Sequence, residues 1–408
     1  MIALARRFLR TGSFTVSRDS PLPPVVQRMQ LADQGPYRPR FLPGTPLAHV
    51  PLHLVDRALG LDGPPQAGWL VHYTGHACVL LALGLLASAA RSAGASPAAA
   101  AMGVVVAGCS WPVWQIARHG GAEPVVGLAL AGFVWGVVSP SRATRIAVCA
   151  LLPWLHPTGA VVAGVVIAAG AADPASHTAP RAHALFRYAR GPLLAASLAA
   201  LSVMLIWNLL YHGSWWGGGY AYSVPGALLT RSPLRVFLDE YLIQCATFAA
   251  IPALLAASAL RQGLSGLRLL ALPGGLFLAI AGLFSFLSYT LGHDPVRRLA
   301  VVWLSCAYTV ARVWDGLDAS PRLARGLLLL SPLLGVYWFT LREWNYYRAA
   351  DGSMLPLVQW LTWWREGSAW WWLWPAACAL LGLWAGARLW AGLSGTRTGA
   401  WSAPSSAS

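Results

Sequence analysis

Residues 69–90 read WLVHYTGHACVLLALGLLASAA, a run that contains no Asp, Glu, Lys or Arg. A helix of about 20 apolar residues is long enough to cross the hydrocarbon core of a bilayer. Similar runs recur along the chain, in which 57% of the residues are hydrophobic and only 11% are charged. The sequence therefore predicts an all-α, polytopic membrane protein.

The apolar runs predict about eleven transmembrane helices within a single multi-spanning domain, residues 66–393. The expected spans are Trp69–Ala90, Pro97–Ala117, Ala122–Val138, Ala143–Leu155, Thr158–Ala172, Pro192–Tyr211, Tyr241–Leu260, Leu267–Thr290, Leu299–Val313, Gly326–Leu341 and Ala369–Leu393. The fourth and fifth are short and are interrupted at Pro153 and Pro157, so they could form one kinked or re-entrant element. Residues 394–408 are rich in Gly, Ser and Ala and predict a disordered cytoplasmic tail.

The charge of the loops predicts the orientation. If the chain enters the bilayer from outside at Trp69, the short inside loops are consistently basic, with Arg91 in the first of them. Residues 1–65 then form the first non-cytoplasmic loop, and the long loops 211–240 and 342–368 lie outside too. Moving the Arg-rich segment 1–65 outward without a preceding helix is disfavoured, so we expect a first transmembrane helix upstream. The alternative keeps this segment in the cytoplasm and inverts every loop.

The net charge of +15 does not indicate nucleic-acid binding. All basic residues are Arg, and cytoplasmic Arg is expected in a membrane protein for orientation and for contact with anionic lipid. The six cysteines are isolated within apolar runs, without a CxxC spacing, so no disulfide framework is expected. Membrane lipid is the expected partner, and nucleic acid is not.

Residues 14–59 form a polar, proline-rich segment ahead of the first apolar run, with Asp19, Asp33 and an expected amphipathic helix over residues 25–33. A long polar segment before a membrane domain usually supports chemistry at the bilayer surface, because the spans cannot solvate charged intermediates. This segment is therefore the first place to look for catalytic carboxylates.

Several motifs occur in a characteristic order along the chain. They are Asp19-Ser20-Pro21, a helix ending at Gly35, Pro43-Gly44-Thr45-Pro46-Leu47 with Pro51, Glu123-Pro124, His156-Pro157-Thr158-Gly159, Asn208 with Tyr211–Tyr220, and His293-Asp294-Pro295-Val296-Arg297-Arg298. In this order the chain resembles the GT-C superfamily of integral-membrane glycosyltransferases, over residues 14–313. It departs from the family pattern by lacking the first helix and by having Arg298 where Tyr is common.

The resemblance implies an inverting hexosyl- or pentosyltransferase in a bacterial inner membrane. Such an enzyme moves a sugar from a polyprenyl-phosphate donor to a lipid, glycan or protein acceptor on the outer face. It implies three groups of site residues: the catalytic candidates Asp19, Asp33 and Glu123, with Asp19 as the preferred base; the donor-phosphate ligands Arg297, Arg298 and His293; and the acceptor- or sugar-binding residues Tyr220, Trp215 and Trp216. A divalent cation at Asp19 is the one cofactor left open.

Each candidate also has a simpler structural explanation. Asp19 could start a turn or cap a helix, and Asp33 could lie on a solvated helix face. Glu123 could favour a helix N-terminus, and Arg297 and Arg298 could anchor a helix at the interface by extending to water.

Histidines at helical spacing raise the question of a zinc site. His49, His53 and Asp56 stand at i, i+4 and i+7, and His72 with His76 repeats the i, i+4 spacing. Ten histidines spread along interfacial segments produce such spacings easily, and no further ligand is evident. No protein metal site is therefore expected from these residues.

Two other functional classes fit an apolar, multi-spanning chain. A secondary transporter or lipid flippase would also contain broken helices, and internal repeats, which are not evident here, would distinguish it. A non-catalytic membrane subunit is the other alternative, and it would tolerate substitution of Asp19.

Overall fold

The computed structural model describes residues 2–12, 44–61, 70–108, 110–118, 122–138, 232–242, 269–286 and 295–314, with a few single positions between 162 and 209. Within these residues the chain forms helices and no strand. The all-α prediction is thus confirmed for the described part of the chain. The predicted spans beyond residue 314, and most of those between residues 143 and 260, lie outside it.

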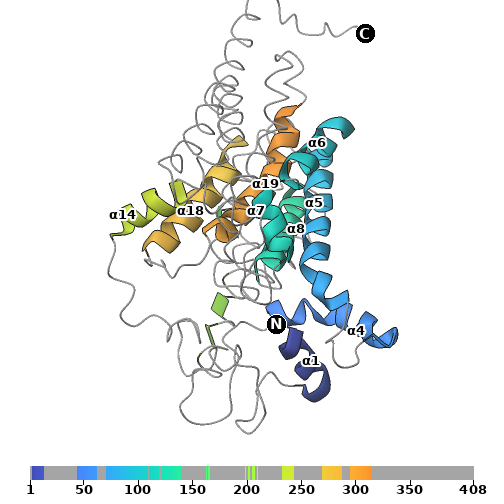
Figure 1. Cartoon of the computed structure of the whole chain (residues 1–408). Coiled ribbons are helices and arrows are strands. Elements are labelled where there is room, and N and C mark those ends of the chain that lie inside the picture. The colour runs from blue at the N-terminus through green and yellow to red at the C-terminus, as the bar shows by residue number, and fades with distance from the viewer. Residues whose placement is uncertain are drawn as a thin grey trace, which may run out of the picture.

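The described helices form a bundle with smaller helices across one end (Figure 1). In chain order they are α1 (Ile2–Thr11), α3 (Gly44–Leu47), α4 (Val50–Ala58), η1 (Leu70–Tyr73), α5 (Thr74–Ser92), α6 (Pro97–Gly108), α7 (Trp111–Arg118), α8 (Glu123–Val138), α14 (Pro233–Val236), the π-helix η2 (Phe237–Leu242), α18 (Ala271–Phe286) and α19 (Pro295–Trp314).

Helix α19 is the centre of the bundle. Every side chain from Leu299 to Ala311 is buried, and α5, α6, α7, α8 and α18 all pack against this helix. On α6, Gly103 lies so close to α19 that a Cβ at this position would collide with the carbonyl oxygen of Ala307. Small residues at a crossing allow two helix backbones to approach closely. Small residues such as Gly103 and Ala307 therefore allow α6 and α19 to pack closely.

Two contacts define the direction of the helices. The guanidinium of Arg312, near the end of α19, donates to the carbonyl of Ala93, just after α5. The indole N–H of Trp135, near the end of α8, donates to the hydroxyl of Ser88 on α5 at 3.1 Å. Because α8 and α19 both pack along α5, all three helices run in the same direction and begin at the same end of the bundle.

The opposite direction is taken by α6. The turn before it contains Gly94, whose φ of +94° is in the left-handed region that favours glycine. Arg91 closes the turn by donating to the carbonyl of Ala95 at 2.6 Å. The α5–α6 hairpin thus places Arg91 at the end of the bundle where α5, α8 and α19 finish.

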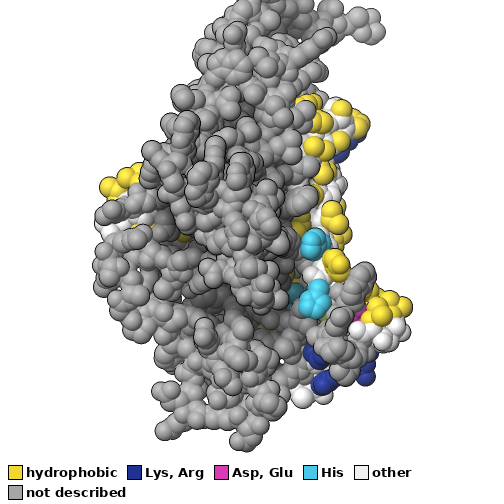
Figure 2. Space-filling view, viewed as in Figure 1, with side chains coloured by type: hydrophobic (Ala, Val, Ile, Leu, Met, Phe, Trp, Pro, Cys, Tyr) yellow, Lys and Arg dark blue, Asp and Glu magenta, His cyan; other side chains and the backbone are white. Residues whose placement is uncertain are grey.

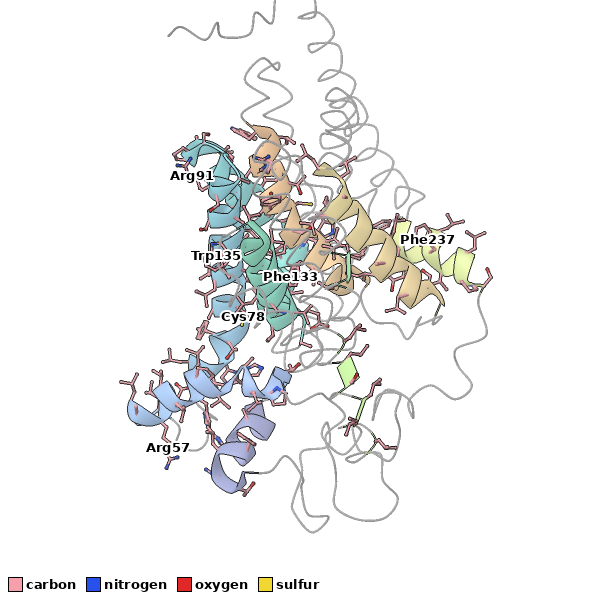
Figure 3. All side chains as sticks on the ribbon, turned by 180° about the vertical axis from the view of Figure 1, so that it is seen from behind. Arg57, Cys78, Arg91, Phe133, Trp135 and Phe237 are labelled. Atoms are coloured by element: carbon pink, nitrogen blue, oxygen red, sulfur yellow. The ribbon has the colours of Figure 1, made fainter. Side chains whose placement is uncertain are left out.

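Helices α1, α3 and α4, here called the platform, lie where α5 begins. Helix α4 packs on η1, which leads directly into α5, and α1 packs on α3 and α4. Figure 3 shows Arg57 of the platform and Arg91 at opposite ends of α5. Helix α5, with 19 residues, is roughly 28 Å long at 1.5 Å per residue.

The predicted span Pro97–Ala117 is instead two helices, α6 and α7. Ser110 lies between them, and both its backbone N–H and its hydroxyl donate to the carbonyl of Ala107. Pro112 follows in the first turn of α7 and has no N–H to donate to the carbonyl of Gly108. This break was not predicted from the sequence because the apolar run continues across it.

Helices also occur in two segments that were predicted as loops. Helices α3 and α4 lie within residues 14–59, outside the expected helix at 25–33, which falls beyond the described residues. Helix α14 lies within the loop 211–240, where Ser232 followed by Pro233 is a common way to begin a helix. Helix α19 begins at Pro295, four residues before the predicted span Leu299–Val313. Proline is again well suited to the first turn of a helix.

Among the described residues, Leu70–Ser92 is the one helix long and apolar enough, by length and composition, to cross a membrane. Four further apolar helices are shorter: Pro97–Gly108, Glu123–Gly136, Ala271–Leu283 and Leu299–Trp314.

Candidate functional site

Three of the predicted site residues, Glu123, Arg297 and Arg298, lie in described helices. All three belong to the first turn of a helix that begins at the platform end of the bundle. The remaining candidates lie outside the described residues: Asp19, Asp33, Trp215, Trp216, Tyr220 and His293.

Glu123 opens α8 and is half-buried. The carbonyl of Ala122 accepts the N–H of Val126 at 2.9 Å, which makes Ala122 the residue that precedes the first helical turn. Pro124 follows, in the turn where a helix loses nothing by lacking an N–H. The positive end of the helix dipole stabilises a carboxylate at this position. Glu123 therefore opens α8 at a position where the helix dipole favours a negative charge.

Helices α8 and α19 touch at Gly127, near the start of α8, and at Leu304, near the middle of α19. A Cβ at Gly127 would lie 2.8 Å from Cδ2 of Leu304. Gly127 comes four residues after Glu123 and Leu304 six residues after Arg298, or about 6 Å and about 9 Å of helix. Because the two helices run in the same direction, the backbones of Glu123 and Arg298 reach nearly the same level at the platform end.

Asp56 joins the platform to this end of the bundle. Its carboxylate is fully buried; Oδ1 accepts the N–H of Leu70, and Oδ2 accepts the N–H of Val71, both at 2.8 Å. The first N–H groups of a helical segment have no partner within it, and bonds to an ionised carboxylate are among the stronger ones. The hydroxyl of Thr74 adds a bond to the carbonyl of Val71 at 2.7 Å. Asp56 thus fixes where the η1–α5 segment begins.

The i, i+4, i+7 spacing of His49, His53 and Asp56 marks the buried face of α4, since all three side chains are buried. Among the described residues, no group of three or more His, Cys, Asp or Glu is arranged to hold a metal ion. Both Asp56 oxygens are bonded to backbone N–H groups, which gives this carboxylate a structural role. The sequence pattern had located the right face but not this role.

The second histidine pair is divided between two environments. His72 is exposed, whereas the ring of His76 is half-buried and lies 5.5 Å from the ring of Tyr73, tilted by 52°. The two side chains therefore do not form one site.

Comparison of the chain with protein-family models, with curated proteins and with solved structures finds no match. Function therefore has to be inferred from the chemistry of these residues. A carboxylate in the first turn of α8 and two arginines in the first turn of α19, at the same end of the bundle, are residue types that can accept a proton and bind a phosphate.

Proposed function

We propose that the chain is a polytopic membrane glycosyltransferase of the GT-C type, which transfers a sugar from a polyprenyl-phosphate donor to an acceptor hydroxyl on the outer face of a bacterial inner membrane. One observation carries the proposal. The helix starts that hold Glu123, Arg297 and Arg298 lie at the same end of the bundle, the end to which Asp56 fastens the platform. An acid and two arginines at one end of the bundle support a site that combines a base with phosphate ligands.

The exposed side chains of the bundle support a membrane setting. Leu80 and Leu81 on α5 are 69% and 60% exposed, and Leu278 on α18 is 64% exposed. No charged residue occurs between Thr74 and Ala90. Figure 2 shows hydrophobic side chains along the edge that α5 and α6 form. Lipid tails are a suitable environment for such a surface, and the length of α5 is close to the roughly 30 Å hydrocarbon core.

The proposed reaction uses one carboxylate and two arginines. A carboxylate, with Asp19 preferred and Asp33 and Glu123 as alternatives, accepts the proton of the acceptor hydroxyl as its oxygen bonds to the anomeric carbon. The bond from that carbon to the phosphate oxygen breaks, and the polyprenyl phosphate leaves with the electron pair. Arg297 and Arg298 stabilise the charge of the departing phosphate.

The test is transfer of radiolabelled hexose or pentose from undecaprenyl phosphate carriers in membranes that contain the protein. Asp19→Asn, Asp33→Asn and Glu123→Gln each remove one carboxylate with little change in size, and Arg91→Gln is the control at an exposed position at the opposite end of α5 (Figure 3). Loss of a general base lowers the rate by about 100-fold or more. We expect that loss in Asp19→Asn and not in Arg91→Gln, at equal protein levels.

Other outcomes separate the alternatives. Loss of transfer in Glu123→Gln with Asp19→Asn active would move the base to α8. Failure of the wild-type protein to consume any donor would reject the transferase, and uptake of the lipid-linked sugar into vesicles would then favour the transporter or flippase.

A further inference from the structure

Helix α4 buries polar side chains and exposes apolar ones. Its buried face carries His49, His53 and Asp56. Its exposed side carries leucines instead: Leu54 on the helix is 46% exposed, and just beyond its end Leu59 is 62% and Leu61 is 43% exposed. A surface helix in water normally buries its apolar side chains and exposes its polar ones. Such a face suits an apolar environment outside α4.

Basic residues accompany this apolar face. Arg57 on α4 and Arg10 on α1 are both exposed. Residues 2–12 and 44–61 contain a single acidic residue, Asp56, which is buried and bonded to backbone N–H groups. Figure 2 shows basic and hydrophobic side chains next to one another at this end of the molecule. Within residues 2–12 and 44–61, the platform thus combines exposed leucines with more basic than acidic residues.

We propose that the platform docks on anionic phospholipid headgroups, with Leu54 and Leu59 inserted at the edge of the acyl region and Arg10 and Arg57 at lipid phosphates. Helices that lie in the interface have this combination of an apolar face and flanking arginines. The inference rests on the membrane setting of the proposed function.

The position of the platform matches this depth. Asp56 fastens α4 to residues 70 and 71, where the apolar η1–α5 segment begins, so α4 lies at the boundary that α5 crosses. A second copy of the chain is the less suitable occupant. Two such faces would bring like charges together without an exposed acid on the described platform to pair with them.

Hydrogen–deuterium exchange of the full chain in lipid nanodiscs tests the proposal. One set of nanodiscs contains phosphatidylcholine alone, and the other contains phosphatidylcholine mixed with phosphatidylglycerol. Peptides covering residues 50–61 are expected to exchange more slowly with the anionic lipid, by about fivefold for each arginine that contacts it. Arg10→Gln combined with Arg57→Gln is expected to abolish the difference, and Arg91→Gln at the opposite end is expected to keep it.

Each outcome of this test has a separate meaning. Equal exchange of residues 50–61 in both lipids would overturn the docking proposal, even if residues 74–90 stay protected, and the membrane setting would stand. Free exchange of residues 74–90 as well would reject the membrane setting and the proposed function with it. Protection that depends on protein concentration and not on lipid charge would assign the face to a second copy. The comparison of the two lipids with the wild-type protein decides the question. The result therefore does not depend on whether a variant folds.

Discussion

Oδ2 of Asp56 accepts the backbone N–H of Val71 at 2.8 Å, across 15 positions of the chain. This bond and its partner from Leu70 join α4 to the first turn of the longest apolar helix segment in the described residues. The relationship couples the placement of α4 to the point at which α5 starts. Asp56 therefore links the placement of α4, and with it the exposure of Leu54 and Leu59, to the start of α5.

Asp56→Asn is therefore expected to destabilise the protein. An amide has one accepting oxygen, so either Leu70 or Val71 would face an NH₂ group and lose its bond. A buried N–H without an acceptor costs roughly 1–3 kcal/mol. The measurement is the free energy of unfolding in detergent by titration with a denaturing detergent, with Arg57→Gln, a neighbouring exposed position, as the control. Equal stability of both variants would contradict the structural role of Asp56.

Gly103 and Gly84 form a matched pair for testing the α6–α19 contact. A Cβ at Gly103 would collide with the carbonyl of Ala307, whereas a Cβ at Gly84 on α5 would meet nothing within 4 Å. Gly103→Ala is expected to lower the free energy of unfolding by roughly 1–3 kcal/mol through overpacking. Gly84→Ala is expected to raise it by up to about 1 kcal/mol because alanine favours the helix. The same titration measures both, and stabilisation by both would mean that α6 and α19 are not in close contact.

The extent of one helix could be predicted closely from the sequence. The predicted span Ala122–Val138 differs from α8, Glu123–Val138, by one residue, because the apolar run is bounded by Glu123-Pro124 and by Ser139-Pro140. The division between α6 and α7 was missed because Pro112 lies inside an apolar run, so hydropathy shows no boundary there. Hydropathy records burial, and it does not record the hydrogen bond that a proline removes.

The site was predictable only in part, for a different reason. Residue type alone identified Glu123, Arg297 and Arg298 as candidates. Their helices begin at the same end of the bundle because of contacts between residues distant in the chain, such as Gly127 with Leu304. Likewise, the His49 and Asp56 spacing identified a face of α4, while the partners of Asp56 lie in the next helix. A single sequence gives the period of a helix, and tertiary packing decides what each face meets.

Trp135 and Ser88 provide a test of the parallel arrangement of α5 and α8. The indole N–H donates to the Ser88 hydroxyl at 3.1 Å. Trp135→Phe and Ser88→Ala are each expected to cost about 0.6 kcal/mol, a usual value for a side-chain bond between helices in a bilayer. The double variant is expected to cost little more than either single one, since both remove the same bond. Fully additive losses in the double-mutant cycle would show that the two side chains do not interact.

Arg312 is expected to hold the far end of the bundle together. Its guanidinium donates to the carbonyl of Ala93, in the turn whose Gly94 has a left-handed backbone. Arg312→Met keeps much of the side chain's apolar stem but removes the donor, so a bond from a charged group is lost, at a cost of roughly 1.5–3 kcal/mol. Hydrogen exchange of residues 91–96 should then accelerate, while residues 50–61 at the platform end should be unchanged. Acceleration at both ends alike would indicate general unfolding, and no acceleration at residues 91–96 would show that Arg312 does not secure this turn.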